Sequence, residues 1–157
     1  MGDTDTRKLR IGILGAANIA RAFTSGVGPS TTVQVVAVAS RDPTKAESFS
    51  RECCNARFHS SYEALADPDI DAIYDPLPNS LHAEWSIRAV DAGKHVLCEK
   101  PLALNATEGR AMFAAAKRHG RHLVEAYPYR VPRPRRRSCA NHRQAVAWAC
   151  RLCRDCS

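Results

Sequence analysis

Short apolar runs alternate with capped helical segments, and this alternation limits what the chain can fold into more than any other feature. Strands are expected where apolar and β-branched residues gather, at 9–14, 33–39, 71–74, 95–98 and 122–126. Helices are expected at 17–25, from Asp42 and Pro43 onward, at 80–92 and at 105–117, with a short helix opening at 60–63. Strands separated by helices predict an α/β fold with a doubly wound parallel sheet.

The formal net charge of +7 is concentrated near the C-terminus. Residues 1–130 hold 16 Lys and Arg against 15 Asp and Glu, whereas residues 131–157 hold seven Arg, no Lys and one Asp. The basic character therefore belongs to the tail and carries no information about the folded domain. Tail arginines could bind nucleic acid, but Trp148 is the only aromatic residue among them, so we expect no nucleic-acid partner.

The cysteines divide between the two parts of the chain. The tail cysteines are Cys139, Cys150, Cys153 and Cys156, and the others are Cys53, Cys54 and Cys98. Thiolates at the tail spacing could bind zinc or an iron–sulfur cluster, but the run has no matching second half, so we expect no metal site. No secretion-type apolar segment follows Met1, and no run reaches the roughly 18 apolar residues of a membrane span. We therefore expect a cytoplasmic protein with reduced thiols and no membrane partner.

The residues after the first expected strand have the pattern of a dinucleotide-binding turn. They read Gly-Ile-Leu-Gly-Ala-Ala-Asn-Ile-Ala over 12–20, which places small residues at Gly15, Ala17 and Ala20. This spacing allows a tight turn, close approach of the backbone to a pyrophosphate, and helix–strand packing. The pyrophosphate would lie at the N-terminus of the following helix. The alternative is a tight turn that small residues pack for folding alone.

The end of the second expected strand bears on which cofactor binds. An acidic residue there would bond the ribose hydroxyls of NAD, but this chain has Ser40 and Arg41. A hydroxyl and a guanidinium suit a 2′-phosphate through charge-assisted hydrogen bonds. We therefore expect NADP in preference to NAD, and the alternative is an ordinary arginine at a helix start.

A proline-rich loop, Pro-Leu-Pro-Asn-Ser-Leu-His over 76–82, follows the third expected strand. Its prolines stiffen the backbone, and Asn79 is expected to cap the next helix. His82 could face a cofactor, or it could be a helix-face histidine whose hydrogen bonds are satisfied within the protein.

The segment Glu99-Lys100-Pro101 places a lysine at the carboxyl end of the 95–98 strand. In open α/β sheets, ligands bind in the crevice outside the carboxyl ends of the strands. A lysine there can donate a proton or hold a sugar hydroxyl, and the alternative is a surface ion pair with Glu99.

These segments occur in an order that resembles a known family. Gly-Ala-Ala-Asn-Ile-Ala at 15–20, Ala-Ser-Arg at 39–41, the 76–82 loop and Ala-Gly-Lys-His-Val-Leu-Cys-Glu-Lys-Pro at 92–101 carry the resemblance. Together they are similar to the glucose-fructose oxidoreductase, inositol dehydrogenase and MocA (Gfo/Idh/MocA) family. Within that family the chain looks like xylose dehydrogenase and dihydrodiol dehydrogenase members. The resemblance covers about residues 8–130.

The resemblance implies a Rossmann NAD(P)-binding domain and hydride transfer between nicotinamide and a sugar, polyol or dihydrodiol. It implies that Lys100 is catalytic, binding substrate and relaying the hydroxyl proton, an effect typically worth about 10²–10⁴-fold. The implied cofactor-binding residues are Gly15, Ala16, Ala17, Asn18, Ile19, Ser40, Arg41, Pro76, Leu77, Asn79, His82, Glu99 and Lys100. Asp75 departs from the pattern, because an apolar residue is usual at that position.

We expect three parts: a disordered N-terminus at 1–8, the dinucleotide-binding domain at 9–126, and a hinge with a disordered basic tail at 127–157. The stretch at 125–130 looks like the hinge from which relatives continue into a second α/β domain. That domain supplies a further catalytic histidine and dimer contacts, and the tail has no counterpart to it. Enrichment of the tail in Arg, Pro, Ala and Cys predicts a frameshift near Arg130 or a truncation.

Two functions follow. The first is an NAD(P)-dependent oxidoreductase present as a truncated nucleotide-binding portion, with low or no activity and without the family-type dimer. The second is a non-enzymatic NADP-binding or partner-binding module in which the tail makes the contacts. Hydride transfer by this chain would favour the first function, whereas cofactor binding without turnover fits both.

Overall fold

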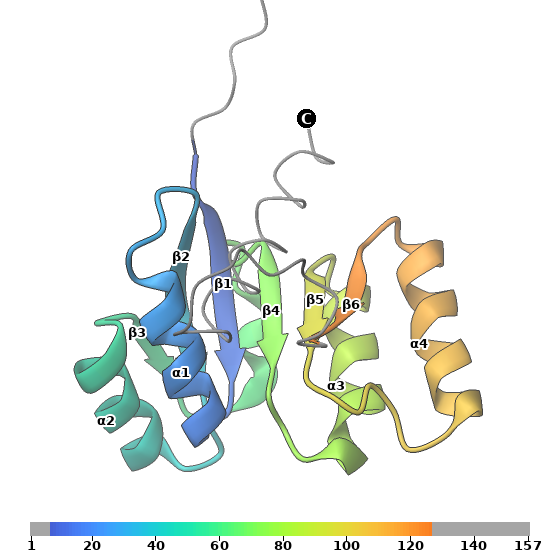
Figure 1. Cartoon of the computed structure of the whole chain (residues 1–157), viewed down its shortest axis with the longest axis horizontal. Helices are drawn as coiled ribbons and strands as arrows, with labels where there is room; N and C mark the ends of the chain where they lie inside the picture. The colour runs from blue at the N-terminus through green and yellow to red at the C-terminus, as the bar shows by residue number, and fades with distance from the viewer. Residues whose placement is uncertain (1–6, 127–157) are drawn as a thin grey trace, which may run out of the picture.

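Six strands form one sheet in the order β3-β2-β1-β4-β5-β6 (Figure 1). The computed structural model describes residues 7–126. Its elements in chain order are β1 (Leu9–Leu14), α1 (Asn18–Val27), β2 (Val33–Ala39), α2 (Pro43–Cys53), β3 (Arg57–His59), the 3₁₀ helix η1 (Tyr62–Ala66), β4 (Ala72–Asp75), α3 (Asn79–Asp91), β5 (His95–Cys98), α4 (Ala106–Arg118) and β6 (Leu123–Glu125). All neighbouring strands run parallel, which confirms the predicted doubly wound sheet.

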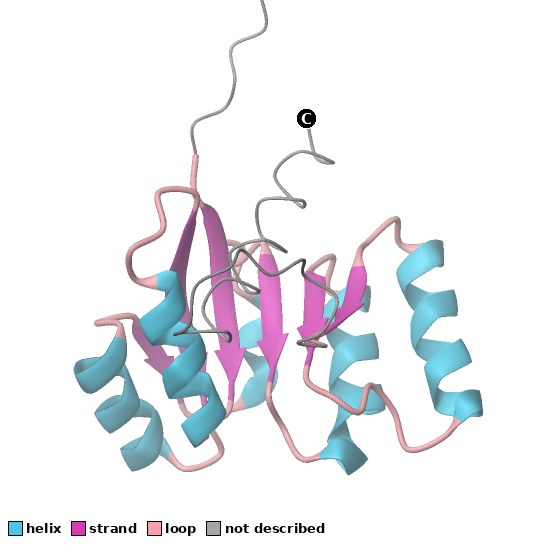
Figure 2. Cartoon of the chain, viewed as in Figure 1, coloured by secondary structure: helices cyan, strands magenta, loops and turns pink. Residues whose placement is uncertain are grey.

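Helices cover both faces of the sheet (Figure 2). Ala20, Phe23 and Val27 lie on one side of α1 and are buried with Phe49 of α2 against one face. The buried residues of α3 and α4, such as Val90, belong to a second cluster with η1 on the other face. Each fully buried side chain of this size contributes roughly 1.5–3 kcal/mol, so two apolar layers fix the sheet between the helices.

Most expected elements are confirmed within one or two residues, but three details differ. The strand β3 was not predicted, because it has only three residues and its Arg57 and Phe58 side chains are exposed at the sheet edge. The expected Asn79 cap is wrong: Pro78 is the N-cap of α3, and Asn79 is its first residue. The short helix opening at 60–63 is the 3₁₀ helix η1, where the Glu63 N–H donates to the hydroxyl of Ser61 at 3.3 Å.

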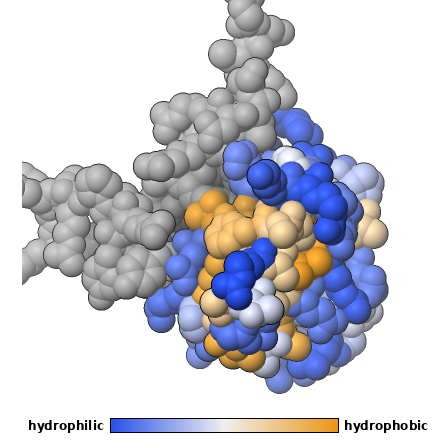
Figure 3. All heavy atoms as spheres, turned by 90° about the vertical axis from the view of Figure 1, so that its right-hand side faces the viewer, coloured by the Kyte–Doolittle hydropathy of each residue, from blue (hydrophilic) through white to orange (hydrophobic). Residues whose placement is uncertain are grey.

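The tail, with its arginines, cysteines and expected frameshift, lies outside the described residues. Between residues 7 and 126, no helix has both the length and the apolar character to cross a membrane. Apolar side chains reach the surface on the side of the molecule that α4 forms (Figure 3), and the exposed large ones include Leu104 and Phe113.

Candidate functional site

Four loops meet at one edge of the sheet because all its strands are parallel. They follow β1, β2, β4 and β5, and the residues that the sequence singled out lie in these loops or in the first turn of the helix that follows. The chain reverses its winding direction between β1 and β4, and ligands bind at such switch points in open α/β sheets.

Gly15 makes the turn after β1, and its conformation requires glycine. Its φ is +89°, and a Cβ at this position would lie 3.2 Å from Cδ2 of Leu77 in the loop after β4. Its N–H donates to the carbonyl of Ala39 at the end of β2, at 2.6 Å. The turn is therefore packed between the loop after β4 and the end of β2. Because glycine has no side chain, only backbone atoms are presented at the carboxyl ends of the strands.

The N-terminus of α1 is free of side-chain capping. Ala17 is the N-cap residue, with an extended backbone and no side-chain hydrogen bond to the helix. Asn18 and Ile19 are exposed, whereas Ala20 is fully buried against the sheet. Uncapped first-turn amides and the positive end of the helix dipole suit an anion, so this cradle fits a pyrophosphate.

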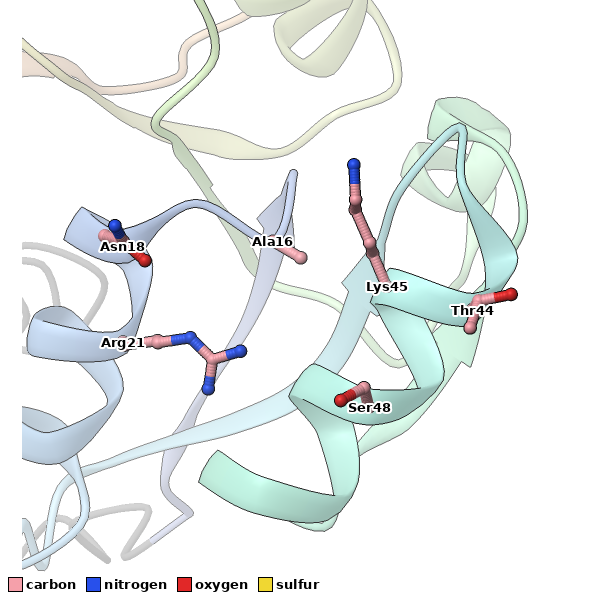
Figure 4. Close-up of a pocket in the computed structure, with 6 residues that line it drawn as sticks. All are labelled: Ala16, Asn18, Arg21, Thr44, Lys45 and Ser48. Carbon is pink, nitrogen blue, oxygen red and sulfur yellow. The ribbon is translucent and has the colours of Figure 1, made fainter.

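A pocket of about 340 Å³ lies between α1 and α2 (Figure 4). Its lining residues are Ala16, Asn18, Arg21, Thr44, Lys45 and Ser48. The Arg21 guanidinium already pairs with Glu52, and the Lys45 ammonium lies 3.5 Å from the Asp42 carboxylate and is largely exposed. The Ser48 hydroxyl donates to the Glu52 carboxylate, and the Thr44 hydroxyl points away from the pocket (Figure 4). The pocket thus offers an anionic group two cations, of which Lys45 is the more exposed.

The sequence analysis did not predict four residues that line the pocket: Arg21, Thr44, Lys45 and Ser48. The four-residue spacing of Thr44 and Ser48 places both residues on one side of α2, which was visible in the sequence. Their approach to Arg21 of α1 depends on how the two helices pack, which no local pattern reveals.

Ser40 and Arg41 lie between β2 and α2. Ser40 is buried, and its hydroxyl accepts the N–H of Asp42 at 3.2 Å. The guanidinium of Arg41 is exposed to solvent and lies 5.9 Å from the centre of the Tyr62 ring. Arg41 is therefore available to a ligand, whereas the Ser40 hydroxyl already shapes the turn into α2.

The loop after β4 divides into a buried and an exposed part. Pro76 and Leu77 are buried, whereas Pro78 and Asn79 are exposed. His82 is fully buried, and both of its ring nitrogens contact backbone carbonyls. The structure thus places the His82 ring inside the protein, as in the alternative of a helix-face histidine, and a contact with the cofactor stays a prediction.

Lys100 stands exposed after β5, and its peptide bond to Pro101 is cis. Its ammonium makes no hydrogen bond or ion pair with any of residues 7–126. The carboxylate of Glu99 is turned elsewhere, since its Oε1 accepts the Tyr74 hydroxyl at 2.7 Å. Glu99 and Lys100 therefore do not form the surface ion pair that was the alternative for this lysine.

The backbone around Lys100 is held from several directions. The Glu99 N–H donates to the carbonyl of Asp75 at 3.0 Å, and the Leu102 N–H donates to Oε1 of Glu125 at 3.0 Å. A fixed backbone with a free ammonium is the arrangement that a proton-exchanging or substrate-holding lysine requires.

Residues 9–127 match a family described as an oxidoreductase family with an NAD-binding Rossmann fold. The chain belongs to the Gfo/Idh/MocA family. It is 42% identical to D-xylose 1-dehydrogenase (NADP(+)) 2 of Haloferax volcanii over 123 residues, and 42% identical to trans-1,2-dihydrobenzene-1,2-diol dehydrogenase of Mus musculus over 121 residues. These alignments cover 78% and 75% of this chain but only 38% and 36% of the two relatives.

A solved Gfo/Idh/MocA-like structure is also similar. The 3-ketoreductase KijD10 from Actinomadura kijaniata, crystallised with TDP-benzene and NADP in an open conformation, superposes with a TM-score of 0.74 at 38% identity. The match covers 77% of this chain and 39% of KijD10. The chain therefore spans less than two fifths of the length of these family members.

Proposed function

We propose that this chain is the nucleotide-binding part of an NADP-dependent oxidoreductase that acts on a CH–OH group of a sugar, polyol or dihydrodiol. The observation that carries the proposal is the Lys100 ammonium at the carboxyl end of β5, which has no partner among residues 7–126 and stands on a backbone fixed to the end of β4.

The residues at the sheet edge would hold the cofactor in three parts. The backbone of Gly15, Ala16, Ala17, Asn18 and Ile19 would cradle the pyrophosphate, because the turn is glycine-shaped and α1 is uncapped. Residues Ser40, Arg41, Arg21 and Lys45 would surround a 2′-phosphate. The loops of Pro76, Leu77, Asn79, Glu99 and Lys100 would face the nicotinamide end, with His82 supporting them from inside.

The bound cofactor supplies hydride chemistry, since nicotinamide accepts or returns a hydride. Oxidation of an alcohol also releases the proton of its hydroxyl group. Lys100 as an amine is placed to take that proton, and as an ammonium to return it in the reverse direction. Such proton exchange is worth about 10²–10⁴-fold in rate.

Relatives support the choice of cofactor and substrate class. The xylose dehydrogenase is named for NADP(+), and KijD10 was crystallised with NADP and a TDP compound. Because the match covers only 38% of the xylose dehydrogenase, we propose low or no turnover by the chain alone.

Cofactor titration of the full chain tests the proposal. NADPH should bind more tightly than NADH, as measured by calorimetry, and tighter binding of NADH would sink the assignment. Hydride transfer is then assayed with aldoses, polyols and dihydrodiols as substrates. Lys100→Met serves as the control in each assay. Hydride transfer that Lys100→Met abolishes would favour the oxidoreductase over the non-enzymatic NADP-binding module, whereas binding of NADPH without transfer fits both.

A further inference from the structure

His82 joins two of the strand-end loops from inside the protein. It lies in the first turn of α3 and is fully buried. Its Nδ1 lies 2.9 Å from the carbonyl oxygen of Pro101, which follows Lys100, and its Nε2 lies 2.8 Å from the carbonyl oxygen of Leu77. One ring thus bridges the loop after β5 to the loop after β4.

Both partners of the His82 ring are carbonyl oxygens, which only accept hydrogen bonds. A neutral imidazole carries one N–H, so one of the two contacts would then place a nitrogen lone pair against an oxygen lone pair. Only the imidazolium donates to both carbonyls. A buried cation is costly without a nearby anion, so the site needs a negative charge.

Asp75 at the end of β4 lies close enough for its charge to act on His82, to which it is linked through Leu77, although the two do not form an ion pair within 4.0 Å. Asp75 is fully buried, its Oδ1 accepts the N–H of Leu77 at 3.1 Å, and its Oδ2 accepts the hydroxyl of Ser86 at 3.3 Å. Burial raises the pKa of Asp75 to about 6, and the Leu77 amide, the charge of His82 and the Ser86 hydroxyl oppose that rise. Asp75 is therefore ionised above pH 6.

The other ionisable groups around this pair do not replace either partner. Burial raises the pKa of Cys98 on β5 far above its usual value, so the thiol stays neutral. The Glu99 carboxylate is directed to Tyr74, and Lys100 is exposed. The Glu125 carboxylate accepts the Leu102 N–H at 3.0 Å and forms no ion pair with His82. Among the described carboxylates, Asp75 is thus the one whose charge acts on His82.

We propose that His82 is a positioning residue: a buried imidazolium, balanced by Asp75, that fixes the backbone of Lys100 against the loop of Leu77. The inference rests on the proposed function for the role of Lys100, but the charged bridge itself does not depend on any bound ligand. It also gives Asp75 a function at a position where the family pattern has an apolar residue.

The protonation of the ring is measurable in the full chain without cofactor. In ¹⁵N-labelled protein at pH 7.5, both ring nitrogens of His82 should carry protons, with the signal assigned by its loss in His82→Gln. An unperturbed histidine is only about one-tenth charged at this pH. In Asp75→Asn, the ring should lose one proton. A wild-type His82 with one protonated and one bare nitrogen at pH 7.5 would overturn the proposal.

The thermal stability of Asp75→Asn gives a second test, in which the direction of the change in Tm separates the two cases. If Asp75 balances a cation, the amide leaves His82 unbalanced, and we expect the Tm at pH 7.5 to fall by roughly 5 °C or more. If His82 is neutral, the substitution removes a lone buried charge, and the Tm at pH 7.5 should rise. A rise therefore contradicts the proposal.

Two conservative variants separate the two contacts. The amide nitrogen of asparagine takes the place of Nδ1, and that of glutamine takes the place of Nε2. In the Asp75→Asn background, which leaves no unpaired carboxylate, His82→Asn should preserve the wild-type backbone amide signals of Lys100 and shift those of Leu77. His82→Gln should do the reverse. Identical spectra for the two variants would contradict the bridge.

The failure of the proposed function is distinguishable from the failure of this inference. If the wild-type chain does not bind NADPH, the oxidoreductase proposal fails, while ring protonation in the free protein still decides the charged bridge. If transfer is measurable, loss of the Pro101 contact in the glutamine variant should lower kcat by up to about 100-fold, with the affinity for NADPH little changed. Equal kcat losses in the asparagine and glutamine variants would contradict positioning of Lys100 by His82.

Discussion

The hydroxyl of Tyr74 donates to Oε1 of Glu99 at 2.7 Å, while the Tyr74 ring stacks on Phe23 of α1 with centroids 4.0 Å apart. The Tyr74 side chain on β4 therefore contacts both Phe23 of α1 and Glu99, the residue before Lys100. Burial and the Glu99 carboxylate raise the pKa of Tyr74 far above its usual value, so the phenol remains a donor at any working pH.

Tyr74→Phe removes this donor and keeps the ring. Because hydrogen bonds to charged groups are worth about 1.5–3 kcal/mol, we expect the free energy of unfolding in urea to fall by about 2 kcal/mol. Tyr62→Phe is the matched control, since the Tyr62 hydroxyl has no hydrogen-bond partner among residues 7–126. Equal effects of the two substitutions would show that the Glu99 contact is not stabilising.

Gly15→Ala should destabilise the domain by about 1–3 kcal/mol, because a φ of +89° disfavours any side chain and the new methyl would press on Leu77. Gly28→Ala, at the end of α1, has an α-helical φ of −47° and only ordinary contacts at 3.5 Å or more, so it should be neutral or slightly stabilising. Urea unfolding of both variants checks the contrast. A stable Gly15→Ala chain would argue against a conformational need for glycine in the turn.

Lys45→Met should weaken NADPH binding by roughly tenfold or more and leave NADH binding unchanged, because a charge-assisted contact to a 2′-phosphate would be lost. The Lys45 side chain is 73% exposed, so the fold should tolerate the change. Lys117→Met, on the exposed surface of α4, serves as the control for lost positive charge. Equal losses of affinity for NADPH and NADH would show that Lys45 does not contact the 2′-phosphate.

His95 should make the domain less stable in mild acid. It is buried, and its Nδ1 accepts the backbone N–H of His122 at 3.0 Å. Burial, followed by the charges of His122 and Arg121, lowers the pKa of His95 to about 4. The folded state therefore holds the ring neutral, while the unfolded chain takes up a proton near pH 6.5.

Stability from His95 is thus fully present above pH 6.5 and is lost as the pH falls from 6.5 toward 4. We expect a loss of about 2 kcal/mol across this range, allowing for partial access of the ring to water. His95→Asn keeps an acceptor oxygen near the position of Nδ1 but cannot titrate. The difference in unfolding free energy between wild type and variant should therefore shrink at low pH, and a constant difference would contradict this account.

Elements whose causes are local could be predicted from the sequence. The apolar runs of β1, β2 and β5, the caps formed by Asp42 and Asn105, and the small residues after β1 all act over a few residues, so their pattern is legible along the chain. Because parallel strands end at one edge, these local features also placed the four loops of the candidate site together.

Which side chains meet depends on how the folded segments pack. His82 reaches Pro101 across 19 residues of sequence, and Tyr74 reaches Glu99 across 25. The approach of Arg21 to Lys45 depends on the packing of α1 beside α2. The short strand β3 forms by hydrogen bonding to the outer side of β2. Hydrogen bonds and charge pairs between distant segments form after the sheet has brought those segments together, so no local pattern encodes which partner a buried polar group will find.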